Sequence, residues 1–126
     1  MRVAVKLIRW NSGLDKVIYF YIFRNMESLT AVNLLGALAQ ESRLSVFRLL
    51  VEAGPQGLSA GEISEELAIP ASTLSFHLKD LNHTGLLDSE RQGRSIIYSA
   101  NYAVMNDLLQ FMQHNCCKRT GTKQCK

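Results

Sequence analysis

Three cysteines lie within the last eleven residues of this 126-residue chain: Cys116, Cys117 and Cys125. An odd number of cysteines confined to one end does not make the disulfide framework of a secreted fold. The first residues have no signal peptide with a small-residue cleavage site. We therefore expect a cytoplasmic protein whose thiols are reduced, and thiols gathered in one place favour the binding of a soft ion.

The three thiols can share one ion only if the local backbone allows it. Neighbouring side chains on a helix point about 100° apart, so Cys116 and Cys117 require that the preceding helix has frayed near His114. Residues 118–122 (KRTGT) are suited to a flexible return. Eight residues span at most about 26–29 Å, so Cys125 can fold back to the pair.

More than one kind of thiol chemistry fits this tail. Three thiolates suit a soft ion with three-coordinate pyramidal geometry. His114 together with Cys116, Cys117 and Cys125 would instead suit tetrahedral zinc or cadmium. A thiol redox protein is the alternative from a different class. However, reactive thiolates usually lie in a folded pocket at a helix N-terminus, and these follow a helix C-terminus.

Composition sets the size and class of the structure that must carry these thiols. Apolar residues make up 47% of the chain and charged residues 20%, which is typical of one globular domain. The longest apolar run, residues 17–23, is far too short to span a membrane. No phosphate loop, paired acid and base, or Ser-His-Asp arrangement occurs, so we expect no enzyme.

Charge is distributed unevenly along the chain. The formal net charge is +3, yet residues 26–117 hold five basic and ten acidic residues, and the bases are concentrated in residues 1–25 and 118–126. Binding to nucleic acid therefore cannot depend on bulk charge and needs a locally basic face.

We expect three segments in the chain. Residues 1–25 form an N-terminal extension with no evident place in the following domain, and Met26 resembles an ordinary start of translation. Residues 26–117 form one domain. Residues 118–126 form a flexible basic tail that contains Cys125.

Apolar spacing predicts the elements of the central domain. Helical stripes comprise Leu29, Val32, Leu35 and Leu38, then Leu44, Phe47, Leu50 and Val51, then Ile63 and Leu67, then Leu74, Leu78 and Leu81. Residues 59–62 (SAGE) form a capping box that begins the third helix. Residues 86–91 and 94–99 read as two strands around a turn at Gln92 and Gly93. A last helix over residues 102–112 is apolar over more than half its girth, which favours an interface with a second subunit.

This order of elements is that of a winged helix-turn-helix fold, mostly α with a small β-hairpin wing. The tight join at residues 68–71 is the turn of the motif, and the following helix is the recognition helix. Its expected DNA-binding side chains are Ser72, Thr73, Ser75, His77 and Lys79, and the wing adds Arg91 and Arg94. Short hydroxyl side chains suit close approach to a groove, and the cations suit phosphate.

Four motifs in order resemble the ArsR/SmtB family: residues 38–50 (LAQESRLSVFRLL), 72–81 (STLSFHLKDL), 85–87 (GLL) and 91–94 (RQGR). The resemblance covers residues 28–117. It implies a repressor that is homodimeric through its first and last helices, binds double-stranded operator DNA and leaves it when a metal or metalloid binds. A winged helix used only for protein contacts is the remaining alternative within this fold.

The resemblance also bears on the inducer. Residues 57–63 (GLSAGEI) lack the Cys-Val-Cys of many arsenic sensors, and the last helix has Asp107 and His114 without the full ligand set of the zinc sensors. Cys116, Cys117 and Cys125 resemble the C-terminal arsenite site of another branch, with a longer spacing to the third cysteine. This implies trivalent arsenic, or antimonite by the same chemistry, as inducer of an arsenic-resistance operon. The cysteine pair alone would suffice for a methylated arsenical.

Overall fold

The computed structural model describes residues 26–121. The N-terminal extension and Cys125 lie outside the described residues, so the expectations for them stay predictions, as do the proposed domain limits. The described elements are α2 (Ser28–Leu38), α3 (Glu41–Ala53), β1 (Leu58–Ser59), α4 (Ala60–Leu67), α5 (Ala71–Thr84), β2 (Leu87–Gln92), β3 (Ser95–Ala100) and α6 (Tyr102–Gln113).

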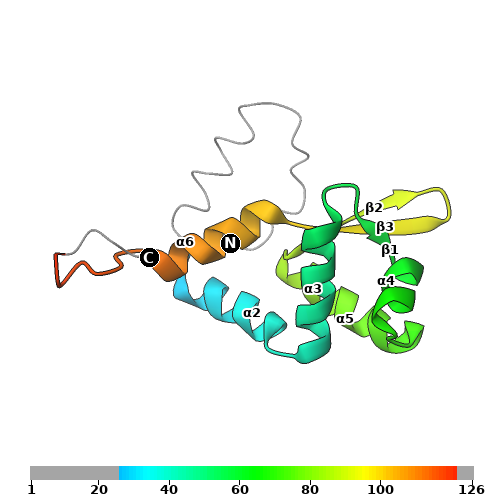
Figure 1. Ribbon diagram of the computed structural model, residues 1–126, viewed down its shortest axis with the longest axis horizontal. Helices are drawn as coiled ribbons and strands as arrows, with labels where there is room; N and C mark the ends of the chain where they lie inside the picture. The colour runs from blue at the N-terminus through cyan, green and yellow to red at the C-terminus, as the bar shows by residue number, and fades with distance from the viewer. Residues whose placement is uncertain (1–25, 122–126) are drawn as a thin grey trace.

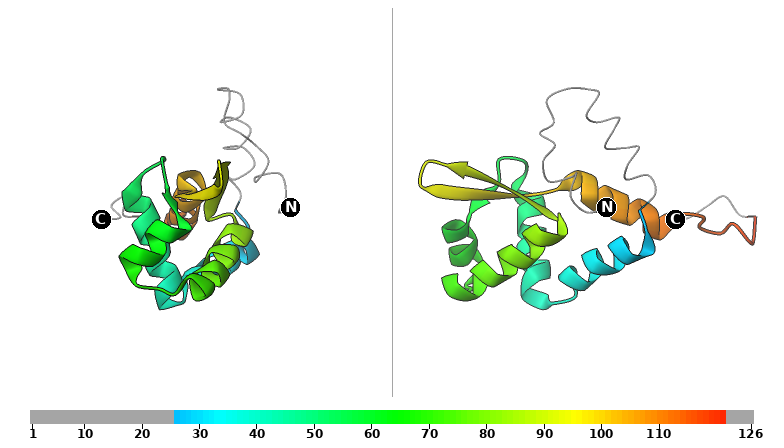
Figure 2. Two further views of the ribbon diagram at one scale, coloured as in Figure 1. Left: turned by 90° about the vertical axis from the view of Figure 1, so that its right-hand side faces the viewer. Right: turned by 180° about the vertical axis from the view of Figure 1, so that it is seen from behind.

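These elements form a mostly helical fold with a β-hairpin wing. Helices α2 and α6 lie side by side at one end, and the hairpin of β2 and β3 extends at the other, beside α4 (Figure 1; Figure 2). Helix α5 packs against α2, α3 and α4. One apolar core joins all of the helices: Ala31, Leu34, Val46, Phe47, Leu50, Ile63, Leu74, Leu78, Leu81, Leu86, Leu87, Ala100, Val104 and Leu108.

Helix α3 is fixed at its start and tied to two neighbours by one arginine. The Gln40 side chain accepts a hydrogen bond of 2.8 Å from the Arg43 amide, which caps the helix. The Arg43 Nε donates to the carbonyl of Ala37 at 2.5 Å, and its guanidinium lies 3.5 Å from Asp80 of α5. Arg43 therefore connects the end of α2 to the recognition helix.

The capping box predicted before α4 is confirmed. The Glu62 amide donates to Ser59 Oγ at 3.2 Å, and the Ser59 amide donates to Glu62 Oε2 at 2.7 Å. The hydrogen bond from the Ser59 amide, and to a lesser extent the Ser59 side chain, stabilise the carboxylate and lower the pKa of Glu62. The helix ends at Ala68 in the left-handed conformation, φ 53°, and α5 begins at Ala71, directly after Pro70, within the join predicted at residues 68–71.

The sheet has a third strand that the sequence analysis missed. The two-residue β1 pairs with β3, giving the antiparallel order β1-β3-β2. Its approach is close: a Cβ built on Gly57, which has φ +67°, would lie 2.2 Å from the Tyr98 carbonyl oxygen. Glycine is therefore required immediately before β1.

The wing turn lies one residue later than predicted. Gln92 pairs with Ser95, so the loop consists of Gly93 and Arg94. Gly93 has φ +63°, and glycine adopts this conformation at the first loop position without steric cost. Arg94 is therefore a loop residue, whereas the strand predicted over residues 94–99 includes it.

Three of the four residues of the first predicted stripe face outward, whereas Leu38 packs against the core. Helix α2 buries Ala31 and Leu34, whereas Leu29 and Val32 are 64% and 61% exposed and Leu35 is 40% exposed. On α6, Val104 and Leu108 are buried, while Leu109 and Met112 are 53% and 61% exposed. The two helices that pack side by side thus both present large apolar side chains to solvent.

Candidate nucleic-acid interface and thiol site

Helix α5 separates its core side chains cleanly from its exposed ones. Leu74, Leu78 and Leu81 are buried, as the spacing predicts. The predicted contact residues Ser72, Thr73, Ser75 and Lys79 are exposed, and His77 is half-buried at the flank of the helix. Four of the five predicted side chains are therefore fully accessible to a ligand, and His77 is accessible only in part.

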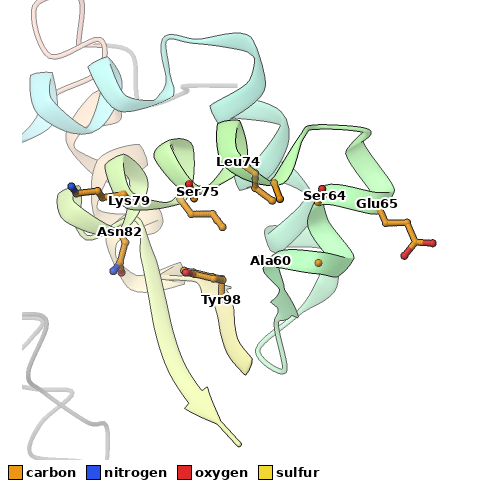
Figure 3. Close-up of a pocket in the computed structure, with 11 residues that line it drawn as sticks. Ala60, Ser64, Glu65, Leu74, Ser75, Lys79, Asn82 and Tyr98 are labelled. Atoms are coloured by element: carbon orange, nitrogen blue, oxygen red, sulfur yellow. The ribbon is translucent and has the colours of Figure 1, made fainter. Parts of the chain in front are cut away.

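A groove of about 470 Å³ runs between α4, α5 and β3. Ser75, Lys79 and Asn82 line it from α5 and Tyr98 from β3, as Figure 3 shows. The Ser75 hydroxyl donates to the carbonyl of Ser72 at 2.8 Å, so its oxygen remains available as an acceptor. Asn82 and Tyr98 were not predicted as site residues. They lie outside the motif pattern that identified the helix.

The charges around the recognition helix favour an anion on the side of the wing. Lys79 and the wing residues Arg91 and Arg94 are exposed cations. The nearby Asp80 carboxylate is paired with Arg43 at 3.5 Å, and this pairing reduces its repulsion of an approaching anion. Glu65 of α4 lines the groove across from Lys79. Lys79, Arg91 and Arg94 come from α5 and the wing, which also carry the exposed Asp80 and Glu90.

The thiol tail follows α6 as expected. The helix ends at Gln113, and the chain continues in tight turns, with left-handed φ values of 59° at Asn115 and 58° at Cys117. This backbone brings the sulfurs of Cys116 and Cys117 to 3.5 Å. Two thiolates bound to one ion at about 2.3 Å in tetrahedral geometry lie about 3.8 Å apart, and a pyramidal ion brings them closer.

Two of the three predicted thiol ligands, Cys116 and Cys117, lie among the described residues. Among residues 26–121, no group of three or more His, Cys, Asp or Glu side chains is arranged to hold a metal ion. A three-ligand site thus needs a ligand from outside that range, as the prediction for Cys125 requires.

Comparison with known proteins identifies the family of this chain. A family model described as a helix-turn-helix domain matches residues 38–90. The HTH-type transcriptional regulator YgaV of Escherichia coli K12 is 32% identical over 69% of this chain and 86% of its own length. The structure of HlyU from Vibrio cholerae is 33% identical, with a TM-score of 0.56, over 69% of this chain and 97% of its own. The chain belongs to the ArsR-type family of winged helix-turn-helix transcriptional regulators.

Two further likenesses agree with this family. An ArsR-like transcriptional regulator from Rhodococcus sp. RHA1, 24% identical, shares the fold with a TM-score of 0.64 over 73% of this chain and 84% of its own. The arsenical resistance operon repressor of Staphylococcus aureus is 28% identical over 73% of this chain and 92% of its own. The relatives named here are transcriptional regulators, a class distinct from enzymes. No helix among residues 26–121 of this regulator is long and apolar enough to cross a membrane.

One buried carboxyl group lies on the last helix of the regulator. Asp107 Oδ2 is shielded from solvent and has no hydrogen-bond partner among residues 26–121. Burial disfavours the ionised form and raises the pKa of Asp107 to about 6. A substantial fraction of this carboxyl group is therefore protonated just below neutral pH, in a helix that also exposes Leu109 and Met112.

Sequence reasoning also missed Phe76 on the recognition helix of the regulator. This side chain is 68% exposed. The sequence signal that could have found it is the helical spacing: Phe76 lies off the stripe of Leu74, Leu78 and Leu81, so its side chain cannot reach the core.

Proposed function

We propose that this regulator is a homodimeric, cytoplasmic repressor that binds double-stranded operator DNA and is released from it by trivalent arsenic bound to C-terminal cysteines. The observation that carries the DNA-binding part is the exposed face of α5, in which hydroxyl side chains and Lys79 lie beside a wing with two arginines. The thiol part is supported by the 3.5 Å separation of two adjacent sulfurs.

The recognition helix and the wing supply different contacts in this proposal. Ser72, Thr73 and Ser75 enter the major groove near the start of α5, where short side chains permit close approach. Lys79 contacts phosphate. Arg91 and Arg94 contact the neighbouring minor groove or backbone from the hairpin. The acidic balance of residues 26–117 makes these few cations the main source of attraction to DNA.

The second subunit covers the apolar end of the molecule. We define the α2 stripe as Leu29, Val32 and Leu35, and α6, which packs beside α2, exposes Leu109 and Met112. Large exposed apolar side chains on two neighbouring helices are typical of a subunit interface. A twofold axis here presents two α5 helices to one face of DNA.

Arsenous acid provides the chemistry of release. Each thiol that bonds to the arsenic of As(OH)₃ releases one molecule of water, so three thiols form three As–S bonds and release three waters. The bonded arsenic orders the tail and alters the end of α6, which belongs to the proposed dimer interface. Because binding of inducer and DNA are linked, the inducer must favour the arrangement with lower DNA affinity. The adjacent position of His114 keeps a zinc or cadmium site as the second candidate.

A reporter gene placed behind the DNA that precedes this gene tests the proposal in cells. Wild-type protein should repress the reporter, and arsenite or antimonite should restore expression. Cys117→Ser should repress without induction, because one As–S bond is lost, whereas Gln113→Ala, a neighbouring change without sulfur, should respond as wild type. Activation in place of repression, or normal induction of Cys117→Ser, would contradict the proposal. Induction by zinc or cadmium alone would move His114 into the site.

A further inference from the structure

The recognition helix exposes one large apolar side chain to solvent, although burial would be more favourable for it. Phe76 is 68% exposed, the highest value among the exposed large apolar residues of the described chain. The other strongly exposed ones, such as Leu29, Val32 and Met112, lie on α2 and α6, where a second subunit accounts for them. Phe76 lies on α5 instead, between Ser75 and His77.

Phe76 occupies the middle of the outward face of α5. Helical spacing places it beside Ser72, four residues earlier, and beside Thr73 and Lys79, three residues away on either side. All three neighbours are exposed, and Leu74 and Leu78 point to the core on the opposite side. The ring thus lies between Ser72 and Thr73, which the proposed function places in the major groove, and Lys79, which it assigns to phosphate.

We infer that Phe76 reads a thymine through its 5-methyl group, an inference that rests on the proposed DNA-binding function. A phenyl ring cannot exchange hydrogen bonds with base edges or pair with phosphate, so it discriminates bases only by apolar contact. The thymine methyl is the one apolar group that a base pair presents in the major groove. Short neighbours such as Ser72 and Thr73 let the ring approach that methyl closely.

The size of the effect follows from the area that one methyl group buries. Removing a buried methyl-sized group lowers affinity by about fourfold, the equivalent of roughly 0.8 kcal/mol. A homodimer on a symmetric site makes the contact twice, so removal from both half-sites lowers affinity by about fifteenfold. Deoxyuridine differs from thymidine only by this methyl group, which makes the substitution specific.

The experiment uses a duplex selected by the wild-type protein from random-sequence DNA. Each thymine pair related by the site symmetry is replaced in turn by deoxyuridine, and binding is measured by fluorescence anisotropy. Wild type should lose about fifteenfold at one symmetric position and little elsewhere. Phe76→Ala should bind the unmodified duplex more weakly and show no further loss at that position. Ile96→Ala, which truncates an exposed apolar side chain of β3, should keep the wild-type pattern.

The outcomes separate this inference from the proposed function. DNA binding in which wild type is insensitive to every thymine methyl would overturn the inference and leave the proposed function intact. An equal loss at the same position in wild type and Phe76→Ala would overturn it too. Failure to select any duplex would overturn the proposed function, and this inference with it. The wild-type scan decides without any variant, so it does not depend on the folding of Phe76→Ala.

Discussion

Replacing Val32 with glutamate should break the homodimer while leaving the protomer folded. Val32 is the central residue of the α2 stripe and is 61% exposed in the single chain. Glutamate is a good helix former and is readily hydrated at such an exposed position, so α2 should keep its stability in the monomer. In a dimer formed through α2 and α6, the same glutamate would lose its contact with water.

The magnitude follows from the exposure of Val32. Burying the exposed part of a valine contributes about 1 kcal/mol, and a twofold interface contains it twice, so its loss costs about 2 kcal/mol. Moving an ionised carboxylate out of water adds at least about 1 kcal/mol for each copy. The total of about 4 kcal/mol corresponds to a dimer Kd raised roughly a thousandfold.

Sedimentation equilibrium over a range of concentrations measures this change, with circular dichroism as the check on folding. Ile96→Glu is the matched control, because Ile96 is also an exposed apolar residue, 45% exposed, but lies on β3 of the wing. It should dimerise as wild type does. A Val32→Glu protein that folds and dimerises with the wild-type Kd would refute the assignment of the interface to α2.

Three other predictions test the DNA interface, the β1–β3 contact and the buried carboxyl group of Asp107. Lys79→Ala should weaken binding to all DNA sequences and reduce the salt slope by about 1 for each protomer; an unchanged slope in anisotropy titrations would remove Lys79 from the phosphate contacts. Gly57→Ala should lower the free energy of unfolding by about 2–4 kcal/mol because its Cβ clashes with the backbone at Tyr98, whereas Gly36→Ala, in open space on α2, should raise it by about 0.5–1 kcal/mol; similar urea midpoints for the two variants would argue against the close β1–β3 contact. The folded pKa of Asp107 lies above its ordinary value of 3.8, at about 6, so the free energy of unfolding should fall as pH rises from 4 to 6 and then level off; after allowance for solvent screening the fall is about 1 kcal/mol, and Asp107→Asn should lack this component in urea titrations across that range.

Sequence periodicity predicted the helices well because their start and stop signals are local. The capping box at Ser59 and Glu62 and the position of Pro70 depend on residues within one turn, so the sequence alone placed the motif. The inward set Leu74, Leu78 and Leu81 follows from the same periodicity. Family resemblance also predicted the fold class that the relatives then showed.

What the sequence could not supply were features that depend on contacts across the fold. The two residues of β1 are too short for any periodic signal, and they form a strand only because β3 lies beside them. The α2 stripe has a helical period, but the period alone does not say whether the protomer core or a partner covers it. The packing of α2 in the fold settles this point: Ala31 and Leu34 are buried, whereas Leu29 and Val32 face out.

In the candidate site, too, sequence patterns identified some residues and missed others. Residue types and helical spacing identified Lys79 and the hydroxyl side chains of α5. They missed Phe76, because an apolar residue within a helix is first assigned to a core. The ligand set of the tail stays a prediction: the structure brings Cys116 and Cys117 together, and Cys125 lies outside the described residues.

The most direct test of the central claim is fluorescence anisotropy of the fully reduced protein on labelled DNA from its own upstream region. Arsenite is titrated into one sample of the complex and zinc into another. The proposed function predicts saturable, salt-dependent binding and release by arsenite at stoichiometric concentration, with no release by zinc. If arsenite leaves the complex bound when all thiols are reduced, the proposed release by arsenic is wrong. If the protein binds no DNA, the proposed DNA-binding function is wrong.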